Sequence, residues 1–409
     1  MGAPDGKDRQ TPARTLLRID AKSAAWAVLC AALVLSWQGL TVRFNYGGNW
    51  SALYCTGANF RIPPALAGEN IYRLKQSYGW DGQFYHYIAH DPFLADRMWK
   101  YIDNPRLRYR RILVPGLAYV LAWGNAGHID TAYRAVILLF FGLGAYWLSR
   151  LAGLHGVGRA WGLAFVCVPA AIASMDRMAV DVALAAFVMA FALYSREGQE
   201  DWKLYAVLLL GALVRDTGLL LVAAYCIWLL LRKRLRRAAI FGSAALPALA
   251  WYKYIDARLP PFVAPRPIGL PFSGLVDRLL HPLPYLFSPL VDSVVKGFDY
   301  LAVAGILLAF AIAFPLARKT GFNPRGWAMV LFVLLGVLLR RDQWLEVSDI
   351  GRVLSPLLIL LALEPPILKR EARFEWLPLA PLCMVAPRCA LQLAPQVLGV
   401  LGITAWGRP

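Results

Sequence analysis

The sequence is poor in charged residues, and above all in acidic ones. Only 17% of its 409 residues are charged, with 25 acidic residues against 43 basic ones. Soluble globular domains carry about 25% charged residues, whereas this chain is 59% hydrophobic. Its apolar runs are continuous rather than alternating, which excludes a transmembrane β-barrel. The composition therefore predicts an all-α, polytopic membrane protein.

Cysteine is scarce, and the sequence has no internal repeat and no low-complexity region. The six cysteines form no CxxC pair, and most of them lie in apolar runs. We therefore expect small core residues rather than a zinc site or a disulfide framework. The missing repeat disfavours transporters that are built from inverted halves.

The net charge of +18 would indicate nucleic-acid binding in a soluble protein. Here most of the excess lies in short loops between apolar runs, which is the positive-inside pattern. We therefore expect anionic membrane lipids, and not nucleic acid, as partners of the basic loops. The basic tail at 1–22 is predicted to be cytoplasmic, and the short loops favour a bacterial inner membrane.

The apolar runs predict about eleven membrane crossings in one integral-membrane domain, 1–409. Two long outer segments interrupt them. The first, 44–130, includes a juxtamembrane helix over 112–123, and the second, 255–297, is rich in proline and is expected to cap the functional site. The predicted crossings lie at about 24–43, 132–149, 160–175, 178–194, 205–231 (a tight hairpin), 238–254, 299–317, 327–339, 353–364 and 376–404 (bent or broken).

The first outer segment contains an unusual stretch, Gly-Trp-Asp-Gly-Gln-Phe-Tyr-His-Tyr-Ile-Ala-His-Asp-Pro, at 79–92. Gly82 after Asp81 lets the backbone turn sharply and leaves the carboxylate approachable. The aromatic residues suit the headgroup level of a bilayer. We interpret the stretch as an active-site loop. The alternative is an interfacial amphipathic helix, because its apolar residues fall at helical spacing.

The predicted topology gathers the ionisable residues on the outer face, where such groups near the membrane are functional candidates. No nucleotide pool exists on that side, so a transferase there needs a donor that is already activated and carried in the membrane. A polyprenyl-phosphate sugar meets this need. The reaction then requires a carboxylate to accept the acceptor proton and cations to stabilise the departing phosphate.

Four motifs carry a resemblance to a known class. They are Asp81-Gly82-Gln83-Phe84-Tyr85, Ser174-Met175-Asp176, Arg215-Asp216-Thr217-Gly218 and Asp349-Ile350-Gly351-Arg352. In this layout the chain resembles the C-class (GT-C) membrane glycosyltransferases. The resemblance implies an inverting transfer from a polyprenyl-phosphate sugar to a hydroxyl of a glycan, lipid or protein.

We assign Asp81 as the general base and expect Asp176 to orient the acceptor or a metal. Cations at the outer ends of late spans are expected to hold the donor phosphate, because the arginine fork binds oxyanions in a bidentate manner. These cations are Arg340, Arg341 and Arg352. The remaining substrate-binding candidates are Gln83, Tyr85, His86 and Arg215.

Each assignment has a structural alternative. Asp176 is also placed to end a helix at the interface, and Arg340 and Arg341 are placed to reach lipid headgroups. Arg215 and Asp216 would pair with each other at a helix kink, which we favour over substrate contact.

His86 and His90 are four residues apart, the spacing of metal ligands on a helix. No further clear ligand stands near them in the sequence, so no metal site is predicted. A divalent cation (Mg or Mn) at Asp81 stays open. Two other functions also stay open, namely a transporter or lipid flippase with a broken helix near Arg215, and a non-catalytic scaffold.

Overall fold

The computed structural model describes residues 20–196, 201–261, 268–285, 288–364 and 376–403. Throughout these ranges the regular elements are α- and 3₁₀-helices, and extended pairing is limited to isolated bridges. The predicted all-α class is therefore confirmed. Most of the predicted cytoplasmic tail, 1–19, lies outside the described residues.

Four helical segments are long and apolar enough to cross a membrane. They are α1 (Ala21–Asn45), α5 (Ala126–Leu154), α13 (Pro289–Lys319) and the segment Leu377–Val400. Each coincides with a crossing predicted from the sequence. The last consists of α18 (Ala380–Ala390) and α19 (Ala394–Val400), with a 3₁₀ turn between them, so the expected irregular helix is present.

The other apolar runs form shorter or broken helices, so the described residues do not contain eleven full-length crossings. The run at 160–175 divides into a 3₁₀ segment, Arg159–Cys167, and α6 (Pro169–Arg177). Proline stands in the first turn of α6, where its missing N–H costs no helical hydrogen bond. Likewise short are α7 (Asp181–Tyr194), α14 (Pro324–Leu338), α15 (Arg341–Trp344), α16 (Val347–Val353) and α17 (Ser355–Ala362).

The predicted hairpin at 205–231 is a pair of helices with a break at Arg215. Helix α8 (Asp201–Val214) ends there, Arg215 is extended, and α9 (Leu219–Leu231) follows a 3₁₀ turn. Gly218 in this turn packs directly against the backbone of Gly211, with no room for a side chain. The chain then continues through α10 (Leu235–Gly242) and α11 (Leu246–Arg258).

The first outer segment contains α2 (Asp81–His90), α3 (Pro105–Arg110) and α4 (Leu113–Leu121). Helix α4 lies where a juxtamembrane helix is predicted, over 112–123, and its position relative to a membrane stays a prediction. Helix α2 is not an interfacial helix, because its aromatic and apolar side chains are buried inside the protein. That alternative is therefore wrong for this stretch.

The proline-rich segment is more helical than predicted. It contains α12 (Ser273–Leu280), and α13 begins at Pro289 rather than near 299, because proline is tolerated in the first turn. Arg278 pairs with Asp299 on α13 at 2.7 Å. The amide of Gly269 donates to the Leu338 carbonyl at 2.8 Å, which ties the segment to α14.

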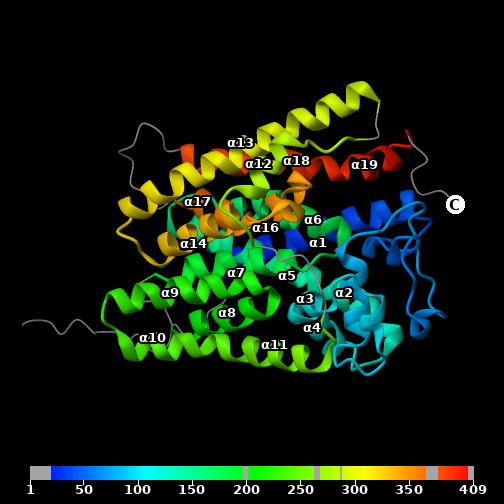
Figure 1. The fold of residues 1–409 in the computed structure, drawn as a ribbon, viewed down its shortest axis with the longest axis horizontal. Coiled ribbons are helices and arrows are strands. Elements are labelled where there is room, and N and C mark those ends of the chain that lie inside the picture. The colour runs from blue at the N-terminus through cyan, green and yellow to red at the C-terminus, as the bar shows by residue number, and fades with distance from the viewer. Residues whose placement is uncertain (1–19, 197–200, 262–267, 286–287, 365–375, 404–409) are drawn as a thin grey trace, which may run out of the picture.

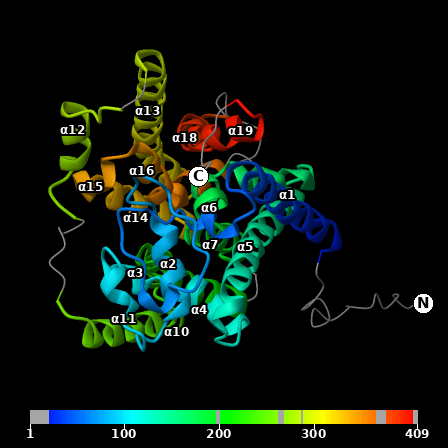
Figure 2. The ribbon, with the colours of Figure 1, turned by 90° about the vertical axis from the view of Figure 1, so that its right-hand side faces the viewer.

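The helices pack around α5, which contacts both α1 and α7, while α13 runs beside α14 and α18 (Figure 1). Figure 2 views the end of the molecule where α2, α3, α6 and α16 lie near one another. This end brings the first outer segment onto the late helices, and it holds the candidate site.

We expect Gly218→Ala to destabilise the protein, because the new methyl group meets backbone atoms that cannot move aside. Overpacking of this kind costs about 1–3 kcal/mol. The measurement is the thermal unfolding temperature of the purified protein in detergent. Gly211→Ala is the matched control, since its methyl group would lie 3.8 Å from Phe187 Cβ, an ordinary contact. Equal unfolding temperatures for both variants would contradict the described break.

Candidate active site

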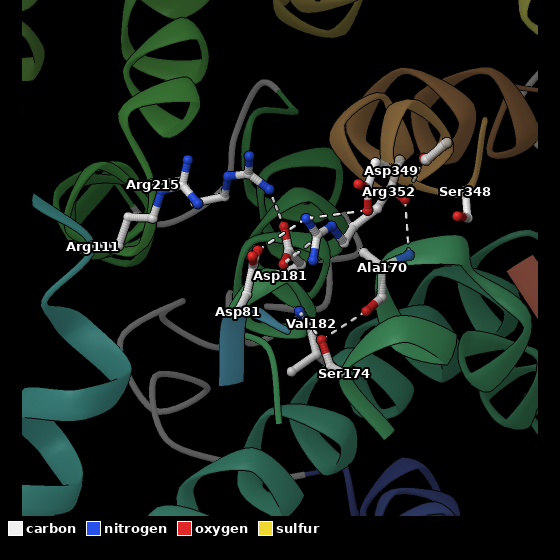
Figure 3. Close-up of polar contacts among 12 residues, drawn as sticks. Asp81, Arg111, Ala170, Ser174, Asp181, Val182, Arg215, Ser348, Asp349 and Arg352 are labelled. Carbon is white, nitrogen blue, oxygen red and sulfur yellow. Dashed lines mark hydrogen bonds and ion pairs between the residues drawn. The ribbon is translucent and has the colours of Figure 1, made fainter. Parts of the chain in front are cut away.

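Asp81, the first residue of α2, pairs with two arginines, Arg108 and Arg352. Figure 3 shows its side chain next to that of Arg352. Its Oδ1 is 2.9 Å from Nη1 of Arg108 on α3, and its Oδ2 is 2.9 Å from Nη2 of Arg352 on α16. The Asp81 side chain is 17% exposed. The carboxylate is thus held on both oxygens but remains within reach of solvent.

A second acid joins the same group. Asp181 begins α7 and pairs with Arg215, the residue at the break between α8 and α9. Nε of Arg352 lies 3.8 Å from Oδ2 of Asp181, so Arg352 bridges the two acids. Asp181 and Arg215 are almost fully buried, with 3% and 6% of their side chains exposed. Asp349, one helical turn before Arg352, approaches it at 3.4 Å.

Arg111 lies beside this group and completes it. Its Nη1 donates to the Tyr85 hydroxyl at 2.8 Å, and its Nε is 3.9 Å from Oδ1 of Asp216. Arg108 also holds the half-exposed Asp103, through Nε at 3.0 Å and Nη2 at 2.8 Å. We call the whole set the arginine–aspartate network. It comprises Asp81, Asp181, Arg108, Arg111, Arg215 and Arg352, with Asp103, Asp216 and Asp349 at its edge.

The network controls the protonation of Asp81. Burial raises the pKa of the Asp81 carboxyl, but the charges of Arg108 and Arg352 outweigh burial and hold the pKa well below its usual range. Asp81 is therefore ionised at any physiological pH. It is also a weak base as long as both arginines are bound, because a general base works best with a pKa near the operating pH.

Several donors of the network are not used. The Nε atoms of Arg111, Arg215 and Arg352 are buried and have no hydrogen-bond partner among the described residues, and Oδ2 of Asp181 also has none there. Leaving a buried donor unpaired costs about 1–3 kcal/mol. An oxyanion would satisfy such guanidinium donors, because planar forks match phosphate and carboxylate oxygens.

The structure brings together only part of the predicted site. Asp81, Arg215 and Arg352 meet in the network, and Tyr85 joins it through Arg111. Gln83 is fully buried and shapes the loop. Its side chain accepts from the Gly57 amide at 3.2 Å and donates to the Tyr78 carbonyl at 2.8 Å.

The other predicted residues lie elsewhere. Asp176, in the last turn of α6, accepts hydrogen bonds from Gln392 at 3.1 Å and Gln396 at 3.2 Å. Arg341 is 57% exposed and pairs with Asp277 at 3.0 Å. Arg340 is exposed as well. Within the described residues, no ion pair connects either arginine to the network.

The favoured pairing between Arg215 and Asp216 is wrong. Arg215 extends to Asp181 instead, and Asp216 faces Arg111. The extended backbone at Arg215 separates the two neighbours at the helix break, so that their side chains meet partners on different elements.

Sequence reasoning did not assign roles to Arg108, Arg111 and Asp181. A signal existed in the basic run at 106–111, which lies in a predicted outer segment against the positive-inside pattern. The arginines of this run point to different partners. Arg108 and Arg111 face the network, whereas Arg110 pairs with Asp256 on α11 at 2.8 Å.

His86, on the buried face of α2, belongs to a separate group. Its imidazole lies close to the imidazole of His90 and to the carboxylates of Glu69 and Asp130. The four candidate ligand atoms, one from each residue, are all within 4.8 Å of one another. Among the described residues this group is the one able to hold a metal ion.

An apolar groove lies between α4, α5, α7 and α8. It has a volume of about 390 Å³ and is lined by residues of α4, α5, α7 and α8. Leu113 and Leu117 of α4, shortly after Arg111, form one end, and Trp202 and Lys203 form part of the lining at the start of α8. The link between the groove and the network is the α3–α4 connection, in which Leu113 follows Arg111 by two residues.

No protein-family model matches the chain, and no curated protein or solved structure shows significant similarity to it. The chemistry of the site therefore follows from the contacts described above.

We expect Asp181→Asn to destabilise the fold, because it leaves Arg215 and one face of Arg352 buried without a counter-charge. Breaking a buried ion pair in this way costs about 3–5 kcal/mol. Thermal unfolding of the purified protein measures the loss. Asp342→Asn, at an exposed position, is the control and should match wild type. An unfolding temperature for Asp181→Asn equal to that of the control would show that the network is not closed in solution.

Proposed function

We propose that the protein is a membrane glycosyltransferase. It moves a sugar from a polyprenyl-phosphate donor to an acceptor hydroxyl at the outer face of the membrane, with Asp81 as the general base. The observation that carries this proposal is the buried set of arginines, with unpaired donors, around one ionised carboxylate. The resemblance to the C-class glycosyltransferases supports the same activity, and a bacterial inner membrane fits the chain's basic loops.

The arginines suit the departing phosphate. A polyprenyl-phosphate sugar is a monoanionic diester, and the released polyprenyl phosphate carries an additional negative charge. Groups already positioned to meet that new charge lower the barrier more than groups that bind substrate and transition state equally. Arg352 and Arg108 are the cations nearest to Asp81, so we assign them to the phosphate.

Binding of the donor also prepares the base. The donor phosphate competes with Asp81 for the guanidinium groups of Arg108 and Arg352. As these contacts are shared with phosphate, the pKa of Asp81 rises from its depressed value towards the ordinary range, and its basicity increases. The unliganded site thus holds its base inactive until the donor arrives.

The transfer step follows from this arrangement. The acceptor oxygen forms a bond to the anomeric carbon, the bond from that carbon to the phosphate oxygen breaks, and the acceptor proton passes to Asp81. Attack on the face opposite the phosphate inverts the anomeric configuration. Asp176, held by Gln392 and Gln396, is assigned to the acceptor side because it lies on α6, which packs against α16.

The groove beside α4 suits the isoprenoid chain of the donor. Its lining is almost entirely apolar, and several of the lining side chains, Leu117 and Leu139 among them, lie on the protein surface. A donor embedded in the bilayer would then reach the network sideways, with its chain in the groove and its phosphate passing Arg111 to reach Arg108 and Arg352. Arg340 and Arg341, both exposed, are assigned to lipid headgroups rather than to the donor.

One observation favours a second function, a transporter or lipid flippase. The break at Arg215 places a charged residue between two apolar helices, and broken helices of this kind occur at transport sites. The two functions differ in whether Asp81 is required for turnover of a lipid-linked sugar.

We expect Asp81→Asn to abolish transfer in protein that still reaches the membrane, with a lower unfolding temperature because Arg108 and Arg352 lose the charge between them. The asparagine keeps the side-chain volume but removes the proton acceptor. Mass spectrometry of lipid-linked sugars in cells that depend on the protein is the measurement. The donor should accumulate in the variant and not in wild type. Asp96→Asn, exposed in the same outer segment, is the control and should leave the lipid pool unchanged.

Identical lipid pools in the wild type and in Asp81→Asn, with both proteins present in the membrane, would overturn Asp81 as the base. If Arg215→Gln then abolished function while Asp81→Asn retained it, the transporter would be the better description.

We expect Arg352→Lys to weaken binding of a short-chain polyprenyl phosphate by about ten- to a hundred-fold, because lysine retains the charge but loses a charge-assisted hydrogen bond of about 1.5–3 kcal/mol. Titration of the purified protein in nanodiscs measures the affinity. Arg341→Lys is the matched control, since Arg341 lies outside the network. Equal affinities for the two variants would remove Arg352 from the phosphate site.

A further inference from the structure

We propose that Glu69, His86, His90 and Asp130 form a binding site for a divalent transition-metal ion, with zinc as the ion that their donor set fits best. The four residues come from three separate parts of the fold. Glu69 lies in the outer segment before α2, the two histidines lie on α2, and Asp130 lies in the first turns of α5. We call them the histidine–carboxylate cluster.

The two histidines are arranged as metal ligands. They are four residues apart on one face of α2, and their Nε2 atoms are 3.2 Å from each other. Two imidazole nitrogens that face each other at this distance need a proton or a cation between them, since two lone pairs repel. His86 is fully buried, and its other nitrogen, Nδ1, has no hydrogen-bond partner in the part of the chain that the structure describes. All polar contacts of its ring are therefore made on the side of the cluster.

The carboxylates close the group from the other side. Oδ1 of Asp130 is 2.8 Å from His86 Nε2 and 4.0 Å from His90 Nε2. Glu69 approaches through Oε2, 3.8 Å from His86 Nε2, and through Oε1, 3.6 Å from His90 Nδ1. The ring of Tyr54 stacks on His86 with centroids 4.2 Å apart and planes 11° apart, which fixes the orientation of the imidazole.

The separations match the size of a tetrahedral site. Zinc binds imidazole nitrogen at about 2.0–2.1 Å and carboxylate oxygen at about 2.0–2.2 Å, so neighbouring ligand atoms lie about 3.3–3.6 Å apart. The contacts given above run from 2.8 to 4.0 Å, and all four ligand atoms lie within 4.8 Å of one another, so the group is close to this size. Small side-chain rotations would bring the four atoms around one ion.

The chemistry of the donors selects the ion. Two neutral imidazoles and two carboxylates balance the charge of a divalent cation, and imidazole favours zinc and its neighbours over magnesium or calcium. Four protein ligands leave no position for substrate, which is the arrangement of a structural zinc site. The ion would fasten the outer segment and α2 to α5, and so hold α2 in place with Asp81 at its far end.

The test uses the full-length protein, purified in detergent through an affinity tag without histidines. The metal content is measured by inductively coupled plasma mass spectrometry, and the unfolding temperature is measured before and after treatment with EDTA and after addition of zinc chloride. Stoichiometric zinc, a lower unfolding temperature after EDTA and recovery with zinc are the expected results. These readouts are independent of transfer activity.

Two variants assign the ion to the cluster. Glu69→Gln and His90→Gln keep polar side chains of similar size and should each lower zinc affinity by about ten-fold or more, since even removal of an outer partner of a ligand costs that much. His128→Gln is the control, because His128 is exposed and stands near Asp130 on α5 without joining the cluster. It should bind zinc as wild type does.

Protein without stoichiometric metal, whose unfolding temperature does not respond to zinc, would overturn the site. So would equal zinc affinities for His90→Gln, Glu69→Gln and His128→Gln in folded protein. Stoichiometric manganese or iron that is lost in the cluster variants would overturn the choice of zinc and confirm the metal site.

Discussion

The ion pair between Asp81 and Arg352 is the interaction on which the rest of the arrangement depends. It joins the first outer segment to a helix near the end of the chain, at 2.9 Å and largely shielded from water. A buried charge without its partner is far less stable than the pair. The folding of the outer segment and the packing of α16 are therefore coupled, because each charge loses one of its partners when the other is absent.

The same pairing gives the site its chemical character. The protein does not hold an open cationic pocket. It holds arginines that are partly occupied by aspartates and retain spare donors. A ligand with several acceptor oxygens would enter by exchange, replacing carboxylate contacts with its own. The free energy of binding is then a difference between two sets of charge-assisted bonds, which favours selectivity for oxyanions over tight binding.

The sequence allowed the membrane class and the four longest apolar helices to be predicted, because long uninterrupted hydrophobic runs have few other stable states. It did not allow the shorter helices to be delimited. A hydropathy profile is an average over a window of residues, so it does not reveal single positions such as Pro169, at which α6 begins. Arg215 and Arg352 were identified because charges in apolar surroundings are costly.

The remaining partners could not be recognised in the same way. Glu69 and Asp130 are ordinary acids in polar stretches, and only the fold shows that they meet two histidines. Asp181 was visible as an acid at the start of an apolar run, but its partner, Arg215, lies beyond the next helix. Arg340 and Arg341 carry the same local signal as Arg352, and tertiary packing alone separates them.

Helix α2 contributes Asp81, its first residue, to the network. It contributes His86 and His90, near its other end, to the histidine–carboxylate cluster. Successive residues of an α-helix are rotated by about 100° around the helix axis. Adding or removing a single residue between Asp81 and His86 would rotate one group away from its partners while the other stayed in place. The number of residues between the two groups is therefore fixed by geometry.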